Sequence, residues 1–500
     1  MKQLLIGIDI GTGSSKGVLT DANGEIIATA SVQHEISLPR PGWAEADADS
    51  MWWKETISIS QQLMQHAGDS NIAGVCVSGM GPCLLLTDTN STPLRPAILY
   101  GIDMRATAEI VELTEKFGNE QIIKRCGTAL STQAVGPKML WAARNEPQVW
   151  AKSRKWFNSN SYIVSRLTGA YVLDHHSASQ CDPLYDLENQ TWFDEWVQEI
   201  CPDLEMPELL WPHEIAGAVN QDAANATGLP VGTPVVTGTI DAWAEAFSAG
   251  VRKSGDLMLM YGSTMFMVQV LPALSTSPLL WTTTGVERNT FTFAAGMATS
   301  GSLTSWMKNI FGGVTFEDLV QEAASTPPGA DGLLLLPYFA GERTPVFDPQ
   351  ARGVIAGLSL RHTRGHIFRA TYEGIGFGIR QILDLFDAAG GKEASRIVAV
   401  GGGTQGGLWT QIVSDITGRS QLIPKKTIGA SYGDSLLAGI GTGLLEPNTD
   451  WAEISHEVVP NPETFDTYQL LFQQYQELYT QTKSQVHILA GIQEKDGSPN

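Results

Sequence analysis

The chain has 500 residues, with 32 Lys and Arg against 53 Asp and Glu, and a formal net charge of −21. This length predicts two large domains, and the acidic balance argues against nonspecific binding to nucleic acid or to an anionic membrane. No apolar run is long enough to span a membrane. Five scattered cysteines without a CxxC pair argue against a structural zinc site and are typical of a cytoplasmic protein.

The first predicted elements form a hairpin whose tip is built from small residues. An apolar strand over 4–10 carries Asp9 near its end, and Lys16 begins the next extended run. The tip between them consists of Gly11, Thr12, Gly13, Ser14 and Ser15. Such residues let backbone N–H groups and hydroxyls approach a phosphate closely, but an ordinary glycine-rich hairpin with a solvated lysine is the alternative. The order Ser-Lys-Gly and the strand that follows exclude a Walker A loop and a dinucleotide-binding turn.

Strands and helices alternate through the rest of the first half, which is typical of an α/β domain. The sequence predicts strands over 25–30, 72–77 and 83–87, and helices over 49–66, 103–117, 138–145 and 158–168.

The opening pattern occurs again in the second half. An apolar strand near 234 leads to Asp241 and a helix over 241–250, and the tip Gly262-Ser263-Thr264 then joins strands over 256–261 and 265–270. Two such hairpins predict two related halves that face one ligand. The remaining predicted elements are strands over 332–336 and 396–400 and helices over 363–389, 406–417 and 461–490.

Asp241 and a glycine-rich turn are the other candidates for chemistry. Asp241 follows a buried-looking strand, at the edge where open α/β sheets hold ligands, and it could accept a proton from a hydroxyl that attacks a phosphoryl group. The alternative role for Asp241 is capping of its own helix. The turn Gly401-Gly-Gly-Thr-Gln-Gly-Gly407 lies between a strand and a helix and would let a planar base lie against the backbone, although many strand–helix turns share this composition.

Several motifs follow one another across nearly the whole chain: Asp9-Ile-Gly-Thr-Gly-Ser-Ser-Lys16, Pro41-Gly-Trp-Ala-Glu45, Gly136-Pro-Lys-Met-Leu-Trp141, Asp241, Gly341-Glu-Arg-Thr-Pro345, Asp348 to Gly353, and Gly401-Gly-Gly through Asp415 to Arg419. In these motifs the sequence resembles the FGGY carbohydrate kinases, the family that contains xylulokinase, glycerol kinase and ribulokinase. The resemblance implies two actin-like (ribonuclease H-like) α/β ATPase domains with ATP and sugar in the cleft between them.

The resemblance also implies residue roles. Asp9 and Asp241 would orient Mg²⁺, and Asp241 would be the general base toward the sugar hydroxyl. The residues expected at ATP are Thr12, Gly13, Ser14, Lys16, Gly262, Ser263, Gly301, Gly402, Gly403 and Gln405.

The sugar-binding segment departs from the family pattern. Xylulokinases tend to show Gln-Met-His where this chain has Met80, Gly81 and Pro82, and proline donates no hydrogen bond. Hydroxyl recognition is therefore expected from other groups as well. The predicted substrate contacts are Trp43, Met80, Gly81, Asp103, Arg105 and Asp241, with plain packing as the alternative for Met80 and Gly81.

We therefore predict an ATP- and Mg²⁺-dependent kinase for a pentulose such as xylulose. The alternatives are a kinase for another polyol or sugar acid (ribulose, gluconate, glycerol or a tetritol) and a catalytically silent, sugar-sensing pseudokinase. The predicted domains are 1–247 for sugar and the first phosphate hairpin, 248–450 for the nucleotide, and a helical extension at 451–500. We expect a cytoplasmic protein without nucleic-acid or membrane partners and leave open a homodimer.

Overall fold

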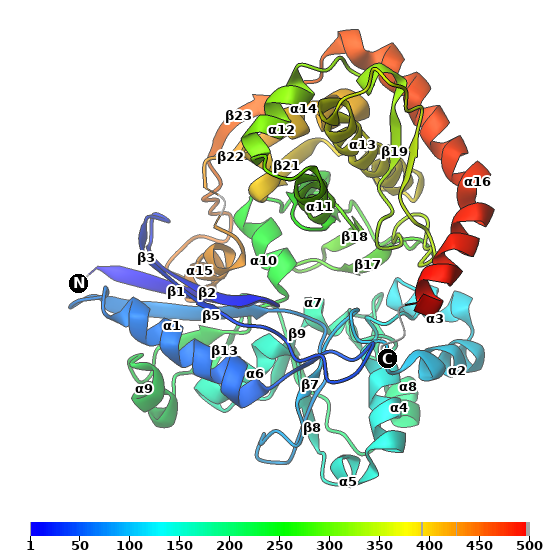
Figure 1. Cartoon of the computed structure of the whole chain (residues 1–500). Coiled ribbons are helices and arrows are strands. Elements are labelled where there is room, and N and C mark those ends of the chain that lie inside the picture. The colour runs from blue at the N-terminus through cyan, green and yellow to red at the C-terminus, as the bar shows by residue number, and fades with distance from the viewer. Residues whose placement is uncertain (1, 392–393, 427, 497–500) are drawn as a thin grey trace. The chain divides into compact units, whose positions relative to one another are not determined.

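The computed structural model describes residues 2–391, 394–426 and 428–496, and the chain divides into two compact units (Figure 1). Unit 1 comprises Met1–Arg252, Thr276–Thr292 and Ile428–Ala452, and unit 2 comprises Lys253–Ser275, Phe293–Thr427 and Glu453–Asn500. Each unit contains a mixed sheet with helices packed on it, which confirms the α/β class. The predicted domain boundaries at residues 247 and 450 stay a prediction.

Unit 1 is built on a six-stranded sheet in the order β13-β14-β5-β1-β2-β3. β1 and β2 form an antiparallel hairpin, and β5 runs parallel to β1 on its other side. The strands are β1 (Gln3–Ile10), β2 (Ser14–Asp21), β3 (Ile26–Gln33), β5 (Asn71–Gly79), β13 (Ile215–Ala218) and β14 (Pro234–Val236). Seven residues of β1 are buried in succession, as expected for a strand with protein on both faces.

Helices cover both faces of this sheet. A Cβ built on Gly7 would lie 1.9 Å from the Ser431 carbonyl oxygen of α15, whereas one on Gly17 would lie 2.3 Å from Ile59 of α1. Gly7 therefore lets α15 pack directly on β1, and Figure 1 shows α15, from late in the chain, beside the first strands. The helices of unit 1 are α1 (Lys54–Met64), α2 (Thr107–Phe117), α3 (Asn119–Cys126), α4 (Val135–Asn145), α5 (Pro147–Trp150), α6 (Ser159–Thr168), α7 (His175–Ala178), α8 (Asp194–Ile200), α9 (Gln221–Thr227), α10 (Asp241–Ser248) and α15 (Ala430–Gly441).

Short strand pairs lie outside the main sheet of unit 1. The predicted strand at 83–87 is observed at Leu85–Thr87, but it pairs with Lys155–Phe157 and does not join the main sheet. The strands of these pairs are β4 (Glu45–Ala46), β6 (Leu85–Thr87), β7 (Ala97–Ile98), β8 (Lys155–Phe157), β9 (Val172–Asp174), β10 (Tyr185–Asp186), β11 (Thr191–Trp192) and β12 (Glu208–Leu210). β17 (Trp281–Thr284) belongs to none of these pairs.

Unit 2 repeats the arrangement of unit 1. Its strands run in the order β18-β16-β15-β21-β22-β23, in which β15 and β16 form the hairpin and β21 runs parallel to β15. This match confirms the two related halves expected from the hairpins. The strands are β15 (Asp256–Tyr261), β16 (Met265–Val270), β18 (Phe291–Met297), β19 (Leu334–Leu336), β20 (Val354–Ala356), β21 (Arg396–Val400), β22 (Gln421–Pro424) and β23 (Ile454–Val458).

Long helices form the rest of unit 2. The 25-residue α13 begins at a capping box made by Thr363 and His366, and it contains the buried ion pair Arg369–Glu373, with Nε and Oε1 2.8 Å apart. The helices are α11 (Gly301–Phe311), α12 (Phe316–Ala324), α13 (Arg364–Ala388), α14 (Leu408–Thr417) and α16 (Phe465–Asp496).

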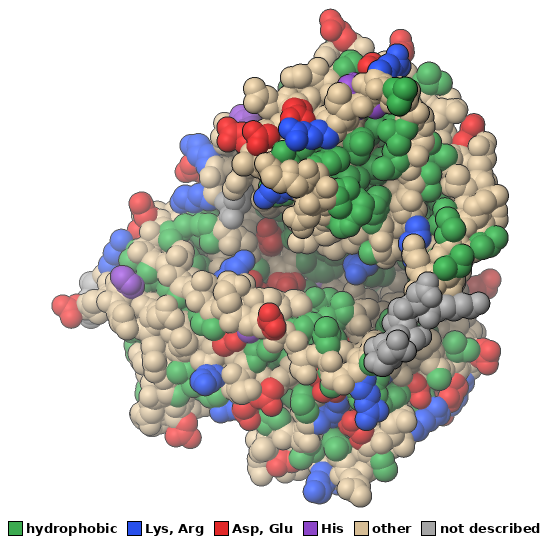
Figure 2. All heavy atoms as spheres, viewed as in Figure 1, with side chains coloured by type: hydrophobic (Ala, Val, Ile, Leu, Met, Phe, Trp, Pro, Cys, Tyr) green, Lys and Arg blue, Asp and Glu red, His purple; other side chains and the backbone are tan. Residues whose placement is uncertain are grey.

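No helix among the described residues is long and apolar enough to cross a bilayer. Figure 2 shows acidic and basic side chains interspersed over the face in view.

Candidate active site

Asp9 and Asp241 lie at the same edge of the unit 1 sheet. Asp9 is the penultimate residue of β1 and is paired with Ser78 of β5. Asp241 is the first residue of α10, and the preceding Ile240 forms a bridge with Gly79 at the end of β5. The two carboxylates therefore follow the carboxyl ends of parallel strands on either side of β5, where α/β sheets bind ligands.

Burial makes these carboxylates hard to ionise. It raises the pKa of Asp9 well above the ordinary value, and the charges of Asp241 and Asp434 add to this effect while Lys16 opposes it. Burial also raises the pKa of Asp241 to about 6, although the N–H of Ala242 donates to its Oδ1 at 2.7 Å. A carboxylate with a raised pKa is a stronger base, and a cation bound nearby would favour its ionised form.

The residues present fit a divalent cation. The buried Oδ1 of Asp9 has no hydrogen-bond partner in the part of the chain that the structure describes. A hard cation such as Mg²⁺ binds through one or two carboxylates and keeps several of its waters. A single carboxylate oxygen without a hydrogen-bond partner is therefore enough to hold such an ion, and a site with many protein ligands is not required. Within the described residues no group of three His, Cys, Asp or Glu side chains forms such a cage.

The sequence analysis missed two further acidic residues of this cluster. Glu245 lies four residues after Asp241, so it shares a helix face with it, and burial together with the Asp241 charge raises the pKa of Glu245 to about 7. Asp434 of α15 is fully buried and accepts the Ser78 hydroxyl at 2.6 Å. The i, i+4 spacing could have indicated Glu245, whereas nothing in the sequence connects Asp434 with Ser78.

The tip of the β1–β2 hairpin is held by several hydrogen bonds. The N–H of Gly11 donates to the Ser14 carbonyl at 3.2 Å, and the Thr12 hydroxyl lies 2.6 Å from the Tyr100 hydroxyl. Gly13 at the tip and Lys16 beyond it are exposed. The predicted phosphate residues therefore form an ordered and accessible tip.

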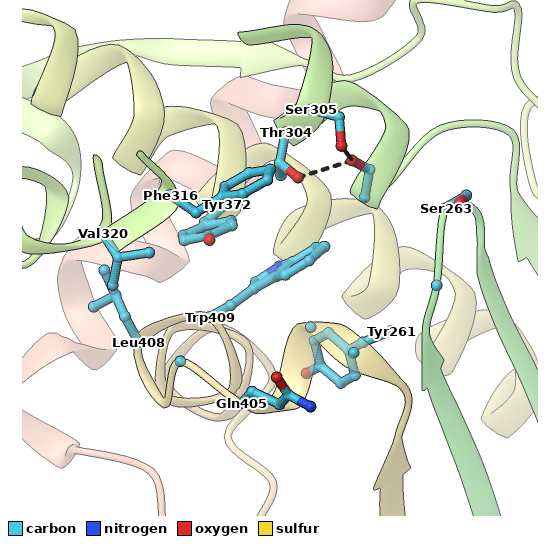
Figure 3. Close-up of a pocket in the computed structure, with 15 residues that line it drawn as sticks. Tyr261, Ser263, Thr304, Ser305, Phe316, Val320, Tyr372, Gln405, Leu408 and Trp409 are labelled. Atoms are coloured by element: carbon cyan, nitrogen blue, oxygen red, sulfur yellow. Dashed lines mark hydrogen bonds between the residues drawn. The ribbon is translucent and has the colours of Figure 1, made fainter. Parts of the chain in front are cut away.

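A cavity of about 510 Å³ in unit 2 brings together six of the residues predicted at ATP (Figure 3). These are Gly262, Ser263, Gly301, Gly402, Gly403 and Gln405. The tip of the β15–β16 hairpin reaches the start of α11, since the N–H groups of Gly301 and Ser302 donate to the carbonyls of Gly262 and Ser263 at 2.9 and 3.0 Å.

Aromatic side chains form a flat wall of this cavity. The rings of Trp409 and Tyr372 are stacked at 4.8 Å with 16° between their planes, and Phe316 lies nearby in Figure 3. Gly403 has room only for hydrogen, because a Cβ there would lie 2.8 Å from the Trp409 ring. A cavity with glycine backbone on one side and aromatic rings on another suits a planar base.

The predicted sugar contacts Asp103 and Arg105 are already engaged with each other. The Arg105 guanidinium donates to both Asp103 oxygens at 2.7–3.0 Å and to Glu45 at 2.8 Å, and its side chain is 0% exposed. Asp103 also accepts the N–H of Ala44 at 2.7 Å. The ring centroid of Trp43 lies 3.9 Å from the guanidinium carbon of Arg105, so this network also positions Trp43. Contact of Asp103 and Arg105 with sugar hydroxyls stays a prediction.

Met80 and Gly81 differ in their surroundings. Met80 is 1% exposed within the hydrophobic core, and its carbonyl accepts the Ser159 hydroxyl at 2.6 Å, so the alternative of plain packing describes its side chain. Gly81 is partly exposed. A Cβ on Gly81 would lie 2.9 Å from Ile240, the residue before Asp241. Of the two, Gly81 stays a candidate substrate contact.

Comparisons with known proteins agree with this geometry. A profile of the FGGY family of carbohydrate kinases, N-terminal domain, matches residues 4–248, and a profile of its C-terminal domain matches residues 257–442. A xylulose kinase of Lactococcus lactis is 30% identical over 498 residues, which cover 97% of this chain and 98% of that protein. A gluconokinase of Bacillus licheniformis is 26% identical over 94% of each chain.

Solved structures show the same fold over the whole chain. The crystal structure of a xylulose kinase from Rhodospirillum rubrum matches with a TM-score of 0.90 and 31% identity, covering 97% of this chain and 100% of that one.

Proposed function

Because the chain belongs to the FGGY family of carbohydrate kinases, we propose that it transfers the γ-phosphoryl group of ATP to a terminal hydroxyl of a pentulose such as xylulose. The observation that carries the proposal is the desolvated pair Asp9 and Asp241 at one sheet edge. The xylulose kinases among its relatives support the choice of sugar.

In this proposal Asp241 is the general base. Its Oδ1 accepts the N–H of Ala242, which fixes the carboxylate at the start of α10. A base with a pKa near 6 is ionised at neutral pH and is stronger than an ordinary aspartate. Asp241 would orient the sugar hydroxyl and accept its proton as the bond to phosphorus forms.

The remaining roles follow from the residues described above. Asp9 would hold Mg²⁺, with Asp241 beside it, and the ion would neutralise charge on the phosphates. We assign the tip at Thr12, Gly13 and Ser14, together with Lys16, to the phosphates, and the aromatic-walled cavity of unit 2 to the base and ribose. Trp43 and Gly81 are the proposed sugar contacts besides Asp241.

The proposal is tested by Asp241→Asn in a coupled assay of ADP formation with D-xylulose. We expect the rate to fall by about 10²- to 10⁴-fold, while calorimetric binding of ADP is retained. Asp222→Asn is the matched control, since Asp222 is an exposed aspartate in the first turn of α9. A rate within a few-fold of wild type in the Asp241 variant would show that another group accepts the proton.

The identity of the sugar is tested separately. Pro82 stands where xylulokinases tend to have a hydrogen-bonding side chain, which leaves room for another substrate. The gluconokinase among the relatives makes gluconate the second candidate. A panel of D-xylulose, D-ribulose, D-gluconate, glycerol and erythritol, compared by kcat/KM, would decide, because a site that hydrogen-bonds several hydroxyls discriminates strongly. A higher kcat/KM for gluconate than for any pentulose would identify gluconate as the substrate and leave the proposed kinase activity unchanged.

A further inference from the structure

A buried histidine lies behind the tip of the β1–β2 hairpin. The side chain of His34, which follows β3, is 7% exposed, and its partner Glu55 of α1 is 9% exposed. Nδ1 of His34 lies 2.9 Å from Oε2 of Glu55, and Nε2 lies 3.0 Å from the Thr12 carbonyl oxygen. One side chain thus joins helix α1 to the backbone of the tip.

The partners of the ring define its protonation. A carbonyl oxygen only accepts hydrogen bonds, so Nε2 must carry a hydrogen. Nδ1 faces Oε2 of Glu55, which also accepts the Ser15 hydroxyl at 2.6 Å, so Glu55 fixes the orientation of the ring.

The tip depends on such bonds for its shape. A Cβ built on Gly13 would have nothing within 4 Å, so side-chain packing does not hold this residue. The backbone N–H of His34 donates to the Gly13 carbonyl at 3.2 Å, in addition to the ring contact with Thr12. His34 therefore fixes two successive carbonyls of the tip, which directs the neighbouring N–H groups away from the protein.

We propose that His34 is a positioning residue for the phosphate-binding tip, and that Glu55 orients the ring so that Nε2–H reaches the Thr12 carbonyl oxygen. This inference rests on the proposed role of the tip in ATP binding.

Two substitutions at position 34 distinguish the contacts made by the two ring nitrogens. The amide nitrogen of Asn takes the place of Nδ1 and that of Gln the place of Nε2, so His34→Asn loses the bond to Thr12 whereas His34→Gln retains it. We expect His34→Asn to raise the KM for ATP by about 10-fold, as for loss of one hydrogen bond, with the KM for the sugar unchanged. His34→Gln should stay within about 3-fold of wild type.

His66→Gln is the matched control, because His66 is an exposed histidine just after α1. Glu55→Gln should raise the KM for ATP in the same direction as His34→Asn. An unchanged KM for ATP in a folded His34→Asn protein, or equal losses in the Asn and Gln variants, would overturn the positioning role.

A second readout does not depend on turnover. Long-range ¹H–¹⁵N spectra of the full chain near neutral pH should show a hydrogen on Nε2 of His34, and an Nε2 without a hydrogen would overturn the bond to Thr12. Calorimetric affinity for ADP with Mg²⁺ should fall in His34→Asn but not in His34→Gln. If no sugar is phosphorylated, the proposed kinase reaction fails, whereas these two measurements still decide on His34.

Discussion

His176 should make the stability of unit 1 sensitive to acid. The ring is fully buried against Trp243, with centroids 4.0 Å apart, and burial lowers its pKa from 6.5 to about 3. Its Nδ1 lies 2.8 Å from the Thr284 carbonyl oxygen and its Nε2 lies 2.8 Å from Nε2 of Gln180. Nδ1 donates to the Thr284 carbonyl oxygen and Nε2 accepts from the Gln180 amide, so the neutral ring satisfies both contacts.

The magnitude follows from the two pKa values. Between about pH 6.5 and pH 3, His176 binds a proton in the unfolded chain but not in the folded chain. The stabilisation that comes from the neutral His176 is therefore complete above about pH 6.5 and decreases as the pH falls below it. At about pH 5 the loss is about 2 kcal/mol, from 1.5 pH units at about 1.36 kcal/mol each.

Urea unfolding near pH 7.5 and near pH 5, followed by tryptophan fluorescence, measures this loss. His176→Gln should be less stable at the higher pH, since it loses the contact with Trp243, but its further loss on acidification should be smaller than that of wild type by about 2 kcal/mol. The wild-type protein and the variant are compared at both pH values, so that the contributions of other titrating groups cancel. An equal loss in the two proteins would refute the reasoning.

Three further outcomes are expected. Arg105→Lys keeps the charge but loses the two-pronged contact with its carboxylate and the stacking on Trp43, so it should destabilise the protein by about 2 kcal/mol in urea unfolding. Gly403→Ala should lower Tm because the added methyl group meets an aromatic ring, whereas Gly402→Ala, with nothing within 4 Å, should keep Tm but weaken ADP binding measured by calorimetry. Pro82→His should shift the ratio of kcat/KM values between D-xylulose and D-ribulose by about tenfold, and an unchanged ratio would assign this position to packing.

Local patterns were sufficient to predict much of the fold and part of the candidate site. Asp9 and Asp241 follow apolar strands, and consecutive parallel strands bring their carboxyl ends to one edge. The hairpin tip at Gly262 and the turn at Gly402 were found from their small residues, and both line one cavity of unit 2.

The interactions that the sequence did not reveal join residues far apart in the chain. Arg105 lies two residues after Asp103 in the chain, but the partners that complete their hydrogen-bond network are Ala44 and Glu45. His34 and Glu55 are 21 residues apart without any periodic pattern between them. Such contacts depend on how a helix packs on a sheet, and no local propensity reports that.

The packing of α15 on β1 has a consequence for the order in which the protein is made. β1 precedes α15 in the chain, yet one face of β1 is covered only once α15, which begins at Ala430, has been synthesised. Until then, β1 would expose apolar residues and the bare backbone at Gly7. A nascent chain stopped at residue 252 should therefore bind chaperones and resist protease poorly, and addition of a peptide spanning 428–452 in trans should restore part of that resistance.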